Sequence, residues 1–144
     1  MSLSDPQLVK REYASETGLL SRRAIYQNAV YESSDGPLEV TFATIAALEP
    51  RSLLEVGCGP GEMAERIGRE LAANVVAVDA SPRMVELART LGVDARVGDV
   101  QDLAFDDGSV DVVLAAWVLF HVPDLDRGLR EIARVLKPAA ASSR

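Results

Sequence analysis

The sequence predicts an α/β protein built on a doubly wound parallel sheet. From residue 50 onward, short apolar strand patterns alternate with helical patterns. The strand patterns are almost continuously apolar, as in strands that helices cover on both faces. The first of them runs into a loop with glycines at alternate positions, Gly57, Gly59 and Gly61. Such a loop is typical of a ligand-binding turn at the carboxyl edge of a parallel sheet.

The first fifty residues predict a helical cap, separate from the sheet domain of residues 51–144. Helices are expected at residues 5–18 and 19–31, followed by a turn cluster, SSDGP, at residues 33–37. Apolar residues then recur at helical spacing until Pro50, namely Leu38, Phe42, Ile45 and Ala46.

The sheet domain begins with two strand–helix units. Residues 52–56 (SLLEV) predict a buried strand, and residues 73–79 predict a second one. Ser81 and Pro82 then read as the cap and first residue of a helix. The buried face of the helix after the first strand is expected to hold Met63, Ile67 and Leu71. The helix after the second strand is expected to bury Met84, Leu87, Ala88 and Leu91.

Two further strands and one helix complete the expected sheet domain. The third strand covers residues 94–98 and leads into a polar loop with one apolar anchor, Phe105. The fourth covers residues 110–116. Asp124 caps the last helix, whose apolar face is expected to comprise Leu125, Leu129, Ile132 and Leu136.

Composition excludes several function classes. A chain of 144 residues suits one domain, and its net charge of −7 argues against a nucleic-acid partner. No apolar run is long enough to span a membrane, and the N-terminus lacks the apolar stretch of a secretory signal. A single cysteine, Cys58, excludes a disulfide framework and most cysteine-built metal sites. We therefore expect a cytoplasmic protein with no metal.

Two acids close the second and third strands beside the glycine loop. Asp79 lies 22 positions after Gly57, where a carboxylate accepts hydrogen bonds from a ribose diol. Asp99 ends the third strand and suits an exocyclic amine such as that of adenine. Two unpaired carboxylates would repel a diphosphate but not a sulfonium cation.

Four segments together are more specific than the glycine loop alone. They read LEVGCGPG, VVAVDAS, ARVGDVQDLAF, and FDDGSVDVVLAAWVLFHV leading to LREIARVLKP. This set closely resembles the class I S-adenosylmethionine-dependent methyltransferases, in particular the small-molecule branch with an E-x-x-R-V-L-K-P motif. The resemblance covers residues 52–138 and implies a Rossmann-like fold with S-adenosylmethionine as cofactor.

The resemblance also implies roles for individual residues. Glu55, Gly57, Cys58 and Gly59 would line the methionine part of the cofactor, and Asp79 with Ala80 would hold the ribose. The adenine would lie near Met84, Asp99 and Val100. The segment Ala115, Ala116 and Trp117 would pass under the methionine end and face the acceptor. The family has no universal catalytic base, because the sulfonium already activates the methyl group and catalysis is mainly positioning.

The C-terminal part departs from the family pattern. After Lys137 and Pro138 the family continues with glycines and a further strand, whereas this sequence ends AAASSR. The sheet is therefore expected to be truncated after its fourth strand, whose apolar outer edge would be bare. We expect that edge to be covered by a second copy of the chain, as in a homodimer, or by the N-terminal helices.

Several candidates also have a structural interpretation. The glycine loop alone would be a tight turn, Asp79 a helix-capping acid, and Asp99 a surface acid. Glu55 would hold loop amides rather than touch a ligand. Cys58 lies near a helix N-terminus, where thiols become reactive, but a packing role is the simpler interpretation. His121, the one histidine, is a candidate general base or a packing residue. Trp117 fits a hydrophobic wall, and Tyr13, Tyr26 and Tyr31 fit a lid over the cofactor or helix packing.

The favoured function is a methyltransferase that acts on a small-molecule acceptor. One alternative is a non-catalytic module that self-associates through its fourth strand. Another is a nicotinamide-dependent oxidoreductase, suggested by the glycine loop and Asp79. The G-x-G-x-G spacing, Asp99 and the lack of a Tyr-x-x-x-Lys pair argue against that alternative.

Overall fold

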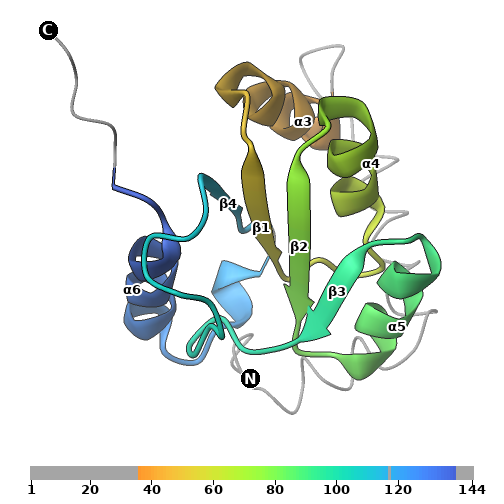
Figure 1. Cartoon of the computed structure of the whole chain (residues 1–144). Helices are drawn as coiled ribbons and strands as arrows, with labels where there is room; N and C mark the ends of the chain where they lie inside the picture. The colour runs from red at the N-terminus through yellow and green to blue at the C-terminus, as the bar shows by residue number, and fades with distance from the viewer. Residues whose placement is uncertain (1–35, 117, 139–144) are drawn as a thin grey trace, which may run out of the picture.

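The computed structural model describes residues 36–116 and 118–138. Within them, four parallel strands form one sheet in the order β3-β2-β1-β4 (Figure 1). The expected α/β parallel sheet is confirmed. The strands are β1 (Ser52–Val56), β2 (Asn74–Asp79), β3 (Asp94–Val97) and β4 (Val112–Leu114).

Helices connect and flank the strands. They are α3 (Pro37–Leu48), α4 (Glu62–Leu71), α5 (Pro82–Thr90), the 3₁₀ turn η1 (Leu119–His121) and α6 (Leu125–Val135). None of the helices in the described part of the chain has the length and apolar character needed to cross a membrane. The helices expected at residues 5–18 and 19–31, most of the expected turn at residues 33–37, the three tyrosines and the tail 139–144 lie outside the described residues.

The two faces of the sheet are buried against different helices. Leu54 and Val56 of β1 belong to an apolar cluster that includes Val135 of α6. Leu53, which points to the other face, packs with Ile45 of α3 and Ile67 of α4. The sheet is therefore the middle of three layers, with α6 on one side and α3, α4 and α5 on the other (Figure 1).

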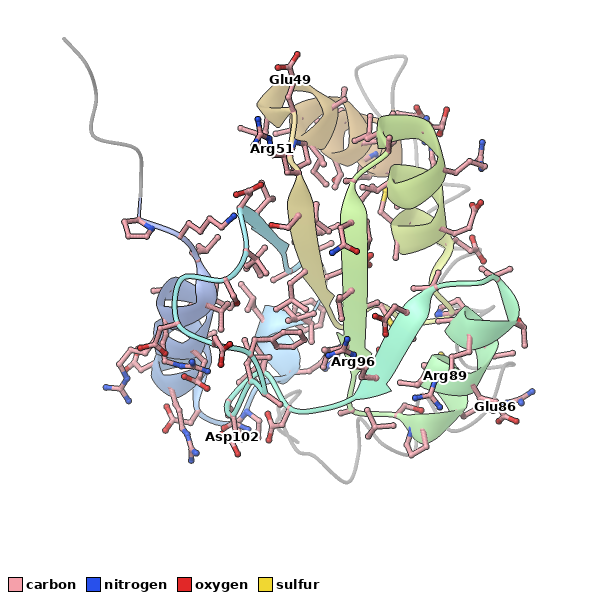
Figure 2. The ribbon with its side chains drawn as sticks, viewed as in Figure 1. Glu49, Arg51, Glu86, Arg89, Arg96 and Asp102 are labelled. Carbon is pink, nitrogen blue, oxygen red and sulfur yellow. The ribbon has the colours of Figure 1, made fainter. Side chains whose placement is uncertain are left out.

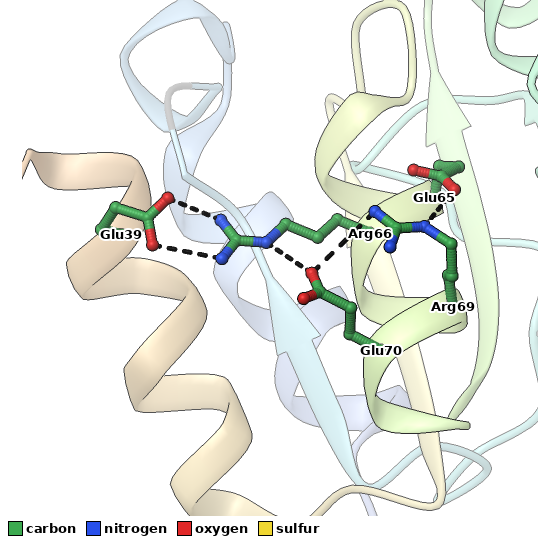
Figure 3. A network of polar contacts seen from close by, with 5 residues as sticks. All are labelled: Glu39, Glu65, Arg66, Arg69 and Glu70. Carbon is green, nitrogen blue, oxygen red and sulfur yellow. Dashed lines mark hydrogen bonds and ion pairs between the residues drawn. The ribbon is translucent and has the colours of Figure 1, made fainter.

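Helix α3 is attached to α4 by a charged contact. Arg66 of α4 donates to both carboxylate oxygens of Glu39 of α3, at 2.8 and 3.1 Å, and to Glu70 at 2.7 Å (Figure 3). Its guanidinium carbon also lies 3.8 Å from the ring centroid of Phe42. This arginine adds a polar contact to the apolar packing of Ile45 that holds α3 against the sheet domain.

Local signals placed the turn into α5 correctly. The Ser81 hydroxyl accepts a hydrogen bond from the Met84 N–H at 3.3 Å, and Pro82 is the first helical residue, as expected. The buried face of α5 differs from the predicted one, because Val85 is buried with Met84 and Ala88 while Leu91 is 46% exposed. The prediction of Leu91 as a core residue is therefore wrong.

The predicted face of α6 is confirmed for Ile132 and Leu136, which pack against the apolar cluster of Val135, and is wrong for Leu125 and Leu129. Leu125 and Leu129 are 43% and 44% exposed, whereas Gly128 and Val135 are buried. Gly128 faces the cluster because a β-carbon there would lie 3.3 Å from Val122. The helix thus packs closely through a residue without a side chain, which an apolar pattern cannot reveal.

The fourth strand is shorter than expected, three residues rather than seven. The strand ends at Leu114, and the next element is η1. Among the described residues, β4 pairs with β1 alone, and its other side carries only an isolated bridge between Val110 and Leu136. The prediction that β4 lies at the outer edge of the sheet is confirmed for this part of the chain.

Candidate functional site

The chemistry-bearing residues gather where the parallel strands end. The loop after β1, the end of β2, the turn after β3 and the segment after β4 all lie at the carboxyl edge of one sheet (Figure 1). Ligands of open α/β sheets bind at this edge, next to the point where the strand order reverses. Here the reversal lies at β1, since β2 is on one side of it and β4 on the other.

The glycine loop is held against β2 by its own backbone. The N–H groups of Gly57 and Cys58 both donate to the carbonyl of Val78, at 2.7 and 3.1 Å. Val118, from the segment after β4, lies directly over Gly57, and a β-carbon on that glycine would be 2.5 Å from the Val118 β-carbon. Glycine is therefore required here by a close approach of two loops.

Asp79 connects the loop to the next helix. Its Oδ2 accepts from the Gly59 N–H at 2.9 Å, and its Oδ1 accepts from the Ser81 N–H at 2.9 Å. Burial raises the pKa of Asp79, and these two hydrogen bonds oppose that rise. Each carboxylate oxygen still has a second lone pair, so the capping interpretation and a ligand-binding role are compatible.

Glu55 is the most unusual side chain of the site. It is 5% exposed, and its Oε2 has no hydrogen-bond partner among the described residues. Burial, and then the charge of Asp79, raise the pKa of Glu55 to about 8. A buried polar atom without a partner is costly, so this oxygen is a candidate for contact with a ligand. The alternative that Glu55 holds loop amides through this oxygen finds no support in the described residues.

Two other candidates are buried at the same edge. Burial, followed by the charges of Asp79 and Glu55, raises the pKa of the Cys58 thiol. Reactive cysteines have lowered pKa values, so the packing interpretation is favoured. His121 lies in η1, is 8% exposed, and has its ring centroid 4.2 Å from that of Phe120.

Asp99 lies beyond the end of β3, directly after Gly98, whose backbone N–H donates to the Asp79 carbonyl at 3.0 Å. It is exposed, and its Oδ1 accepts from the backbone N–H of Gln101 at 2.8 Å. The Gln101 side-chain amide lies 3.2 Å from both Asp99 oxygens. A small pocket of about 100 Å³ adjoins this turn, between Arg96 of β3 and Asp102 of the following loop (Figure 2).

The remaining predicted residues divide into exposed and buried positions. Ala80 and Ala116 are exposed at the edge. Val100 is buried, and Met84 is completely buried within α5, beneath the turn that carries Asp79. Trp117 lies outside the described residues. The described residues hold no cluster of three or more potential metal ligands.

Sequence reasoning missed two residues of this edge. Val118 contacts the glycine loop, and Gln101 contacts Asp99. Neither has a motif of its own. The sequence did contain a signal for Gln101. In a turn, the side-chain amide of a residue two positions after an acid can donate a hydrogen bond to that acid.

Comparison with known proteins identifies what this arrangement resembles. The family model of a methyltransferase domain matches residues 54–141. A ubiquinone biosynthesis O-methyltransferase from Xanthomonas oryzae pv. oryzae is 44% identical over 93 residues, which are 60% of this chain and 38% of the relative. Its counterpart from Xanthomonas axonopodis pv. citri is 42% identical over 111 residues, 71% of this chain and 46% of the relative. The chain thus spans less than half the length of these curated relatives.

Solved structures show the same fold. A SAM-dependent methyltransferase of Thermotoga maritima, described as a possible histamine N-methyltransferase, aligns with a TM-score of 0.66 and 26% identity over 88% of this chain and 56% of that one. The [4+2]-cyclase SpnF aligns with a TM-score of 0.70 and 28% identity over 90% of this chain and 56% of that one.

Proposed function

This chain belongs to the methyltransferase domain family, and from that premise we propose that it transfers a methyl group from S-adenosylmethionine to a small-molecule acceptor. The single observation that carries the proposal is the pair of acids at the carboxyl edge, Glu55 and Asp79, beside the glycine loop. The family and its SAM-dependent structural relative imply S-adenosylmethionine as the cofactor.

The residues present fit that cofactor. The Oε2 of Glu55, which has no partner among the described residues, offers a buried site for a cationic group, whose charge would favour the ionised carboxylate over the protonated form. Around Gly59 there is open space, since a β-carbon there would have no neighbour within 4 Å. Both features favour a cation-bearing ligand that approaches the loop backbone.

We assign each part of the cofactor to residues at the carboxyl edge of the sheet. Glu55, Gly57, Cys58 and Gly59 flank the methionine end, and Asp79 with Ala80 takes the ribose. Asp99 and Val100 take the adenine. Ala116 and Trp117, with His121 as a candidate proton acceptor, face the acceptor. When bound, the cofactor supplies an activated methyl group, and the protein's task is to align the acceptor with it.

For the acceptor we propose a small molecule with a nucleophilic oxygen. The O-methyltransferases among the relatives support an oxygen rather than a nitrogen nucleophile. Formation of S-adenosylhomocysteine with a panel of small phenols, compared with matched amines, tests this assignment. Turnover with the amines alone would contradict it.

Isothermal titration with S-adenosylhomocysteine tests cofactor binding. We expect micromolar binding, weakened at least about tenfold by Asp79→Asn, which places a donor amide against one of the two N–H groups. Asp94→Asn is the matched control, because Asp94 lies at the amino end of β3 and bonds Arg96. No binding to the folded parent chain would contradict the proposed function.

A second candidate is a module that self-associates without turnover. The outer side of β4 favours it, because β4 pairs with no strand other than β1 in residues 36–116 and 118–138, and an unpaired apolar strand edge is a template for another chain. We propose self-association, as a homodimer, through this edge whether or not the chain turns over. Sedimentation velocity over a range of concentrations tests it, together with hydrogen exchange at residues 112–114. A monomer at every concentration with rapid exchange there would contradict it.

We also propose a cytoplasmic location. The single cysteine suits a reducing compartment, where disulfides are rare. Fractionation of cells that express the tagged chain tests this, and recovery outside the cytoplasm would contradict it.

A further inference from the structure

The side chain of Gln101 connects two parts of the molecule that are distant in sequence. Its Nε2 lies 3.2 Å from each carboxylate oxygen of Asp99. Its Oε1 accepts from the backbone N–H of Asp124 at 3.0 Å. Asp124 is the N-cap of α6, where its own carboxylate accepts from the Arg127 N–H. One side-chain amide therefore joins the acid at the end of β3 to the start of α6.

This arrangement leaves Asp99 with a fixed orientation and unused acceptor capacity. The backbone N–H of Gln101 holds Oδ1 at 2.8 Å, and the side-chain amide spans both oxygens from one side. Asp99 is nevertheless exposed, so its carboxylate has acceptor capacity that a ligand can reach. A carboxylate held in this way is prepared to accept a hydrogen bond from a ligand.

We propose that Gln101 is a positioning residue that orients Asp99 toward the exocyclic amine of the ligand and thereby sets the preference for adenine. The inference rests on the proposed function, because it requires the adenine of the cofactor to lie beside Asp99. Gln101 itself does not touch the ligand. It acts through Asp99, and α6 keeps Gln101 in place through the N–H of Asp124.

A carboxylate can replace the amide of Gln101. It has nearly the same shape, but it accepts hydrogen bonds where the amide nitrogen donates them. Gln101→Glu retains an oxygen that accepts from the Asp124 N–H, but it replaces the donor facing Asp99 by a second acceptor. Near neutral pH the two carboxylates repel each other. Asp102 and Asp124 are the other acids of this turn, and both are common to parent and variant.

The experiment measures how much more tightly the protein binds a ligand that has the 6-amino group than one that lacks it. Dissociation constants are determined by titration for S-adenosylhomocysteine and for its analogue with hydrogen in place of the 6-amino group. We expect the parent to prefer the amine, and Gln101→Leu and Gln101→Glu to reduce that preference about fivefold at pH 8, the effect of one hydrogen bond.

Arg134→Met is the matched structural control. Arg134 attaches the carbonyls of Leu103 and Phe105 to α6, so its loss loosens the same loop without removing a bond to Asp99. We expect this control to retain the preference of the parent. An unchanged preference in both Gln101 variants, an equal loss in Arg134→Met, or a parent that binds both ligands equally would overturn the inference. A folded parent that binds neither ligand would instead show that the proposed function itself has failed.

Discussion

The side chains of Glu55 and Asp79 point to the same face of two neighbouring strands. Their carboxylates differ in the hydrogen bonds that they accept. Asp79 accepts from two backbone N–H groups, whereas the Oε2 of Glu55 has no partner within residues 36–116 and 118–138. Burial and the Asp79 charge raise the pKa of Glu55 to about 8, from an ordinary value of 4.5. In the folded protein without ligand, Glu55 is therefore protonated at neutral pH.

The raised pKa of Glu55 predicts that the protein is less stable in alkali. Between pH 4.5 and about 8 the folded state holds a proton on Glu55 that the unfolded state has lost. The free energy of unfolding therefore falls as pH rises through this range, by up to about 1.4 kcal/mol per pH unit from this group. It becomes independent of Glu55 above the folded pKa.

Urea unfolding of the parent and Glu55→Gln from pH 5 to pH 9 measures this effect. The neutral amide cannot titrate, so the difference in unfolding free energy should shift in favour of Glu55→Gln as pH rises to about 8. Asp79 is present in both proteins and largely cancels. A difference that does not change with pH would show that Glu55 is ionised in the folded protein.

Two glycines of the loop should differ sharply in their tolerance of alanine. Both have positive φ, +86° at Gly61 and +56° at Gly59, which costs an alanine about 1–2 kcal/mol. A β-carbon at Gly61 would also lie 2.6 Å from that of Ala88, whereas at Gly59 it would meet nothing within 4 Å. We expect Gly61→Ala to destabilise the fold by about 2–5 kcal/mol and Gly59→Ala by about 1–2 kcal/mol.

Chemical denaturation of the two variants side by side gives the comparison. Because Gly59 lies where the cofactor is proposed to approach, Gly59→Ala should weaken S-adenosylhomocysteine binding more than its small effect on stability would suggest. If the free energy of unfolding falls equally in the two variants, α5 moves away from the loop without an energetic cost.

Local patterns were sufficient to predict the parts of this fold that local interactions determine. The strand SLLEV matches β1 at both ends, and Ser81 with Pro82 starts α5 as expected. A buried strand and a capped helix start have their signals within a few residues. The acids Asp79 and Asp99 follow from the same logic, since the strand ends place them at one edge.

The errors arose where long-range packing decides the outcome. Leu129 matches the apolar spacing of α6, but the helix turns Gly128 inward, where a β-carbon would lie 3.3 Å from Val122 and 3.5 Å from Val100. Gln101 and Val118 acquire their roles only through partners distant in the chain, Asp124 and Gly57. The pattern of a single segment contains no information about such partners.

Arg134 is the residue most responsible for holding the loop between β3 and β4 on α6. Its guanidinium donates to the carbonyls of Leu103 and Phe105, both at 2.8 Å, and to Glu131 at 2.6 Å. Glu131 in turn accepts from the Leu103 N–H at 2.8 Å. Because five N–H donors in a planar group serve several acceptors at once, no other side chain can replace it.

Loss of this contact should destabilise the protein and loosen the loop selectively. We expect Arg134→Met to lower the melting temperature by roughly 5 °C or more, because two carbonyls and Glu131 lose a charged donor. Arg130→Met is the control, since Arg130 is exposed on the same helix. Calorimetry gives the melting temperatures, and hydrogen exchange should show faster exchange at the Leu103 amide in Arg134→Met only. If both variants melt alike and Leu103 stays protected, the bond from Leu103 to Glu131 holds the loop without the arginine.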